Sequence, residues 1–102
     1  MTFHTTSTVS ETGEPTVEVS GELDLASAED FATQVGESAG DANVVVLDLS
    51  GVTFMDSTGL AALIKIRNRL TDRGGDLRLA AASRAVERVL ELTGMSDTFG
   101  PA

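Results

Sequence analysis

The order of apolar and polar positions divides the chain into predicted strands and helices. Residues 2–10 are rich in β-branched side chains but have few apolar anchors, which predicts an edge strand. Residues 11–15, "ETGEP", are typical of a turn, and residues 16–21 then alternate valine with polar side chains. The beginning of the chain is therefore predicted to form a β-hairpin.

Two segments with helical periodicity come next. Apolar residues recur at positions 28, 31, 32 and 35, which predicts a helix with Ser27 as its N-cap and Asp30 as a capping-box acid. A second amphipathic pattern begins at Ser57 and predicts a helix that continues to Arg73. Gly74 is expected to end it, because glycine readily adopts the left-handed conformation that follows a helix.

The remaining segments complete an alternating α/β pattern. Residues 43–50, "NVVVLDLS", form an unbroken apolar run, which predicts a central strand covered on both faces and leading through residues 51–54. Residues 76–80 predict a further strand, Ser83 predicts the cap of a third helix that Gly94 ends, and the tail has room for a short last strand. The order β-β-α-β-α-β-α predicts one α/β domain over residues 1–102, a mixed sheet with three to four helices packed against it.

Charge narrows the classes of partner. The net charge is −9, and all seven basic residues lie between Lys65 and Arg88, whereas residues 1–50 hold ten acidic residues and no Lys or Arg. Phosphate groups are repelled by such a surface, so nucleic acid and anionic membrane surfaces are not expected as partners. Insertion into a membrane is not expected either, because no apolar run approaches the ~20 residues that span a bilayer. A partner with a basic patch fits better, although acidity for solubility alone is an open alternative. The lack of cysteine and of a signal peptide fits a cytoplasmic protein.

The segment "FMDSTGL", residues 54–60, gathers a carboxylate, two hydroxyls and a glycine where a strand is followed by a helix. In the structural interpretation, Asp56 or Ser57 caps the helix and Gly59 lets it pack closely. In the functional interpretation, Ser57 accepts a phosphoryl group at the positive end of the helix, beside Asp56. Thr58 is expected to point toward packing.

Catalytic interpretations find little support in the residues. His4 is the one histidine and lies in the predicted edge strand, so a Ser-His-Asp triad has no base. The chain has no P-loop and no acidic cluster with the ligand spacing of a calcium or zinc site. We therefore expect no enzymatic activity, no cofactor and no metal.

Three segments together resemble a bacterial family, the STAS-domain anti-sigma factor antagonists. They are "VSGELDLASAEDF", "VVVLDLSGVTFMDSTGLAAL" and "RAVERVLELTGM", and their most specific elements are "GELD" at 21–24 and "MDSTGL" at 55–60. The resemblance covers nearly the whole chain in the right order. It implies a mixed sheet with helices, in agreement with the pattern above.

The resemblance also implies a mechanism. Such proteins bind an anti-sigma factor that is a serine kinase, which frees a sigma factor, and phosphorylation of a serine ends the binding until a metal-dependent phosphatase removes the phosphate. The matching serine here is Ser57. The implied partner-binding residues are Asp24, Asp56, Ser57, Thr58 and Gly59, and ATP and metal belong to the partners. The alternative is a constitutive STAS subunit of a larger assembly, such as a lipid transporter or a stress-signalling complex.

Overall fold

The fold is a five-stranded mixed sheet with three helices in the part of the chain that the structure describes. The computed structural model describes residues 3–9 and 13–101. In chain order the elements are β1 (Phe3–Val9), β2 (Pro15–Leu23), α1 (Ala28–Ala39), β3 (Val44–Met55), α2 (Ser57–Asp72), β4 (Asp76–Ala82), α3 (Arg84–Leu92) and β5 (Gly100–Pro101). This order confirms the predicted α/β class, the number of helices and the short last strand.

The strands lie in the sheet in chain order, β1 to β5, with β1 at one edge. β1 is antiparallel to β2, and the pairs β2–β3, β3–β4 and β4–β5 are parallel. The hairpin and the edge position of the first strand are therefore confirmed. Part of the predicted turn falls on residues 10–12, which lie outside the described residues.

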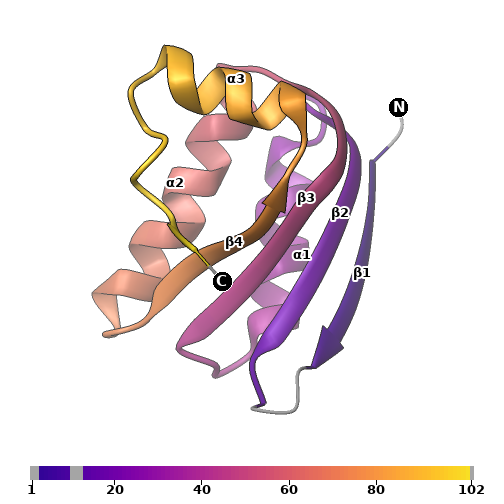
Figure 1. Ribbon diagram of the computed structural model, residues 1–102. Coiled ribbons are helices and arrows are strands. Elements are labelled where there is room, and N and C mark those ends of the chain that lie inside the picture. Colours follow the sequence, from indigo (N-terminus) through magenta and orange to yellow (C-terminus); the bar gives the residue numbers. More distant parts are fainter. Residues whose placement is uncertain (1–2, 10–12, 102) are drawn as a thin grey trace.

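α1 and α2 lie side by side over one face of the sheet, and α3 crosses its upper end (Figure 1). Phe31, Leu47 and Leu63 are among the largest side chains of the core and have no exposed surface. Phe3 of β1 meets Phe31 edge to face, with ring centroids 6.1 Å apart, so the aromatic pair fastens the edge strand to α1. The core therefore holds the helices in fixed positions relative to the strand ends.

The prediction that β3 is covered on both faces is wrong for its second half. Val45, Val46 and Leu47 are buried, but Asp48 is only half-buried and Ser50 is exposed on the face that α1 and α2 leave free. There Asp48 accepts hydrogen bonds from the backbone and the hydroxyl of Ser50. β3 runs through residues 51–54, as predicted, and ends at Met55.

The predicted helix caps differ in outcome. Ser83 caps α3 as expected, since its hydroxyl accepts a hydrogen bond from the Val86 amide at 3.3 Å. Ser27 precedes α1, but its side chain makes no cap bond and donates instead to the Glu22 carbonyl at 2.6 Å. The predicted capping box with Asp30 is therefore wrong, because the Ser27 hydroxyl is turned back toward the end of β2.

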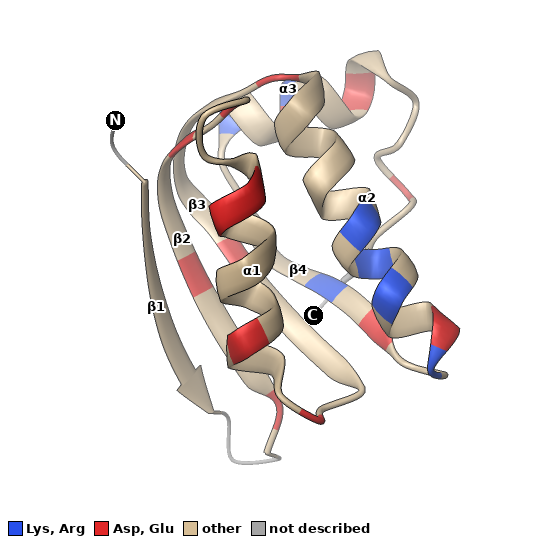
Figure 2. Ribbon diagram, turned by 180° about the vertical axis from the view of Figure 1, so that it is seen from behind, with Lys and Arg blue, Asp and Glu red and all other residues tan. Residues whose placement is uncertain are grey.

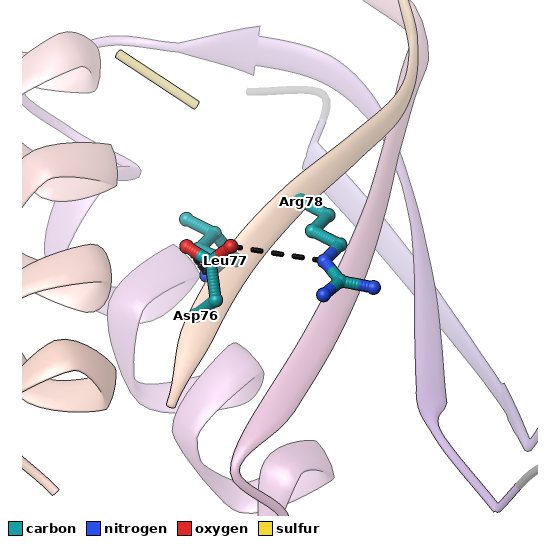
Figure 3. A network of polar contacts seen from close by, with 3 residues as sticks. All are labelled: Asp76, Leu77 and Arg78. Atoms are coloured by element: carbon teal, nitrogen blue, oxygen red, sulfur yellow. Dashed lines mark hydrogen bonds and ion pairs between the residues drawn. The ribbon is translucent and has the colours of Figure 1, made fainter. Parts of the chain in front are cut away.

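The start of β4 is fixed by local polar contacts. The Asp76 carboxylate accepts a hydrogen bond from the Leu77 amide and lies 3.7 Å from the Arg78 guanidinium (Figure 3). The Asp76 amide donates to the carbonyl of Asn43, just before β3, at 2.8 Å. Gly75 precedes this bond and lies so close to β3 that a Cβ atom there would be 1.8 Å from the Asn43 carbonyl oxygen.

Replacing Gly75 by alanine should therefore destabilise the fold. We expect Gly75→Ala to lower the free energy of unfolding by about 1–3 kcal/mol, the usual range for overpacking against atoms that cannot move aside. Gly36→Ala is the matched control, because a Cβ at Gly36 meets nothing within 4 Å. It should be neutral or stabilising by up to about 1 kcal/mol, since alanine favours a helix interior. Urea unfolding of both variants measures this, and equal effects would contradict the steric argument.

Candidate functional site

The two motifs singled out in the sequence meet at the carboxyl ends of β2 and β3. Leu23 pairs with Met55 in the parallel ladder, and the Asp56 amide donates a hydrogen bond to the Leu23 carbonyl at 3.3 Å. Residues 21–24 and 55–60 therefore lie next to one another although about 30 residues separate them in sequence. Ligand and partner sites of α/β sheets gather at such strand ends.

Asp56, rather than Ser57, is the N-cap of α2. It has an extended backbone, and its Oδ1 accepts hydrogen bonds from the amides of Thr58 at 2.9 Å and Gly59 at 3.1 Å. The Thr58 hydroxyl also donates to Oδ1. One carboxylate oxygen thus satisfies two of the free amides at the helix start, which stabilises the first turn.

These contacts lower the pKa of Asp56 below its ordinary value of 3.8. The main cause is the hydrogen bond from the Thr58 hydroxyl, and the bonds from the Gly59 and Thr58 amides act in the same direction, while desolvation opposes them. The carboxylate is therefore charged at neutral pH. A negative charge stays fixed beside Ser57.

The two hydroxyls of the motif have different environments. Ser57 is exposed at the first residue of α2, and no hydrogen bond within the described residues engages its hydroxyl. Thr58 is half-buried, and its hydroxyl is engaged by Asp56. Of the two hydroxyls, that of Ser57 is therefore the accessible one. Thr58 instead supports the cap, which agrees with the expectation that it points toward packing.

Gly59 permits the close approach of α2 to β2. A Cβ atom at this position would lie 2.4 Å from the Leu23 carbonyl oxygen and 3.0 Å from the Leu23 Cβ. The predicted role in close packing is thus supported by the geometry. Gly59 is buried, so it positions the turn at Ser57.

Asp24 organises the loop that lies beside this turn. Its Oδ1 accepts hydrogen bonds from the Ala26 amide at 3.0 Å and the Ser27 amide at 3.2 Å, and the Ser27 hydroxyl lies at the same distance. The Asp24 carbonyl accepts the Ala28 amide at 2.8 Å. The side chain therefore fixes the path of residues 24–28 into α1.

Two exposed apolar residues next to the motifs were missed by the sequence reasoning. Leu25 is 79% exposed in the loop after Asp24, and Phe54, 47% exposed, precedes the buried Met55. The apolar pair Phe54–Met55 is visible in the sequence. Which of the two side chains faces solvent depends on how the end of β3 packs in the folded structure. Both residues increase the apolar surface around the site.

The described residues hold no cluster of metal-ligating side chains. Within residues 3–9 and 13–101, no group of three or more His, Asp or Glu is placed to hold a metal ion. His4 lines a hollow on the open face of the sheet with Glu18 and Asp48, whereas Thr58 lines a different hollow between α1 and α2. No helix in this part of the chain combines the length and apolar character that a membrane span needs.

Comparison with known proteins agrees with this geometry. The family model described as STAS domain matches residues 6–101. The chain is 30% identical over 84 residues to the anti-sigma-B factor antagonist of Bacillus subtilis strain 168, covering 79% of this chain and 74% of that protein. It is 40% identical over 62 residues to the human putative solute carrier family 26 member 10P, covering 57% of this chain but only 11% of that much longer protein.

Solved structures show the same fold. An anti-sigma factor antagonist from Mycobacterium paratuberculosis superposes with a TM-score of 0.83 at 31% identity, covering 99% of this chain and 87% of the other. SpoIIAA, a Bacillus cell fate determinant, superposes in its phosphorylated form with a TM-score of 0.72 at 18% identity, covering 97% and 91%. The second similarity establishes the fold alone.

The cap at Asp56 predicts a pH-dependent contribution to stability. Because the pKa of Asp56 is lower in the folded state, its contribution is complete well above pH 3.8 and is lost as the pH falls through the folded-state value. At pH 7, Asp56→Ala should lower the free energy of unfolding by about 1 kcal/mol, the usual cost of losing a cap.

Urea unfolding of parent and variant between neutral and acidic pH checks this. The difference between them should shrink below pH 3.8. Asp97→Ala, which removes an exposed acid after α3, is the control and should change the free energy of unfolding by less than about 0.5 kcal/mol. A difference between parent and Asp56→Ala that stays constant with pH would show that the charge of Asp56 does not support the cap.

Proposed function

The chain belongs to the STAS-domain family, and we propose that it is an anti-sigma factor antagonist whose binding is ended by phosphorylation of Ser57. The relatives in Bacillus subtilis and Mycobacterium paratuberculosis carry that functional name. The observation that supports the proposal best is the position of Ser57. It is the exposed first residue of α2, with a free hydroxyl, at the place where "GELD" and "MDSTGL" meet.

The surface around Ser57 fits a protein partner. Exposed Leu25 and Phe54 supply apolar area, and Glu22 and Asp24 lie beside them at the end of β2. Apolar anchors surrounded by polar groups are typical of binding surfaces. We propose that the anti-sigma factor covers this surface and contacts Asp24, Asp56, Ser57 and Thr58. Gly59 contributes indirectly, because it allows α2 to pack closely against Leu23 of β2.

Phosphorylation of Ser57 would act by charge rather than by refolding. A phosphate adds nearly two negative charges at pH 7. The start of α2 tolerates them, because the positive end of the helix dipole favours an anion there. Facing a docked partner, however, they would add to the fixed charge of Asp56. A surface complementary to the unmodified site would then be repelled, which ends the binding.

The remaining components would come from the partners. In this proposal the anti-sigma factor is the serine kinase and supplies ATP, and a metal-dependent phosphatase restores the Ser57 hydroxyl. The chain itself is a binding module of the cytoplasm without enzymatic activity of its own.

A second candidate function is a constitutive subunit of a larger assembly, such as a lipid transporter or a stress-signalling complex. This second candidate is supported by the match to a short part of a much longer solute carrier protein, since STAS domains also occur inside large proteins. In that case Ser57 would be only a contact residue. Intact-mass and peptide analysis of the protein from its own host separates the two: a phosphate on Ser57 supports the switch, and unmodified protein under growth and stress supports the subunit.

Substitutions at Ser57 should separate binding from folding. We expect Ser57→Asp to weaken binding to the cognate anti-sigma factor by at least about 100-fold, because like charges facing each other at an interface cost several kcal/mol. Ser57→Ala should bind the anti-sigma factor like the unmodified parent. It should also keep its affinity when ATP is added, because the residue that the kinase would modify is missing. Calorimetric titration measures both, and circular dichroism checks that the fold is unchanged.

The control is Ser96→Asp, which adds the same charge at an exposed serine after α3. It should bind within about threefold of the parent, since an exposed charge outside the interface changes affinity little. Equal binding by Ser57→Asp and the parent would contradict the switch.

A further inference from the structure

A column of basic residues runs along the C-terminal half of α2. Lys65, Arg69 and Arg73 are spaced by four residues, so they lie on successive turns of the helix and its C-cap. Figure 2 shows this concentration of Lys and Arg on α2, beside acidic residues on α1. Like charges at this spacing destabilise a helix. A column of this kind, in a chain of net charge −9, therefore stands out from the rest of the surface.

Carboxylates of the described residues do not neutralise this column. Among the described residues, the ion pair with an N–O distance within 4.0 Å is the one between Arg78 and Asp76, and both of these residues lie on β4. Arg73 is held by backbone, since its guanidinium donates to the Ala42 carbonyl at 2.6 Å. Lys65 and Arg69 are exposed and have no such contact among these residues. These two cations are available to an anion from outside.

The column forms one wall of a groove between α1 and α2. A hollow of ≈ 550 Å³ that includes Thr58 and Lys65 shares Ala32 and Arg69 with a second hollow of ≈ 220 Å³, so the two follow one another along the helices. Their floor is apolar and is formed by Ala32, Val35, Ala39, Ala62, Ile66 and Leu70. From Thr58 to Arg73 the groove is about 22 Å long, at 1.5 Å per helical residue.

We propose that this groove docks an acidic amphipathic helix of a partner protein. An apolar floor between two helices fits the apolar face of a third helix. Acidic side chains along one edge of that helix would meet Lys65 and Arg69. The opposite wall carries Glu29, and together with the net charge it repels the dense phosphates of nucleic acid. The groove therefore fits a partner whose acidic residues are confined to one edge of one helix.

The groove extends the surface proposed for the anti-sigma factor, since it begins at Thr58, next to Ser57. The inference rests on the chain being a binding module, but not on which protein it binds. It assigns Lys65 and Arg69 a role in binding that is separate from the phosphorylation switch. A partner that covers both the surface around Ser57 and the groove would contact acidic residues near Asp24 and basic residues along α2. These opposite charges would fix the orientation of the partner.

A titration without any anti-sigma factor tests the groove. The probe is a helix-stabilised peptide of about 16 residues, matched to the groove length, with Leu and Ala on one face and Glu along the adjacent edge. It is added to the isotope-labelled full chain, and amide shifts are followed by NMR. Shifts should gather on residues 28–40 and 58–73. Lys65→Glu/Arg69→Glu should weaken binding at least about tenfold, while Arg84→Glu/Arg88→Glu, with the same change in net charge on exposed residues of α3, should leave it unchanged.

Several outcomes would overturn the inference. These are no localised shifts at millimolar peptide, equal shifts with a peptide that has Lys in place of Glu, or equal loss in the two double variants. Matching shifts with inorganic phosphate would assign the column to a small anion instead. Self-association of the parent that is lost in Lys65→Glu/Arg69→Glu would assign the groove to a second copy of the chain. Failure here would leave the Ser57 switch standing, because the switch is measured with a different partner and different variants.

Discussion

The site depends on one close contact between the start of α2 and the end of β2. The Asp56 amide bonds to the Leu23 carbonyl, and Gly59 approaches the same carbonyl so closely that a Cβ atom would clash with it. This contact fixes where the helix begins relative to the sheet. Because Asp56 then takes the cap position, the next residue, Ser57, is the first residue of the helix and is turned to solvent. The exposed hydroxyl follows from the packing beneath it.

The same contact explains how one turn can serve both structure and the proposed regulation. The hydrogen bonds that the cap needs come from Asp56, so the Ser57 hydroxyl has no structural task among the described residues. Thr58 strengthens the cap and lowers the pKa of Asp56, which keeps a negative charge in place. A modification of Ser57 therefore changes the surface charge without removing a contact on which the helix start depends. This separation is what an electrostatic switch requires.

The sequence predicts the order of elements well because periodicity reports burial, and burial decides each strand and helix. It also predicts Gly59 and the helix start at Ser57. Other features depend on tertiary contacts. Ser27 looks like a cap in sequence, but its hydroxyl bonds to Glu22, at the end of another element. Sequence could not decide whether Asp56 or Ser57 caps α2, and it could not show that Phe54 is exposed while Met55 is buried. These outcomes follow from how β2 and β3 end together.

The groove between α1 and α2 illustrates the same limit on a larger scale. In the sequence, the basic residues of α2 indicate only an uneven charge distribution. Their meaning changes once α1 is packed beside α2, because small side chains such as Ala32 and Ala62 leave a depression where larger ones would fill the space. Charge alone attracts many anions, and an apolar floor alone attracts many helices. Together they select a narrower class of partner, and the position of the groove next to Ser57 places that selection beside the proposed switch.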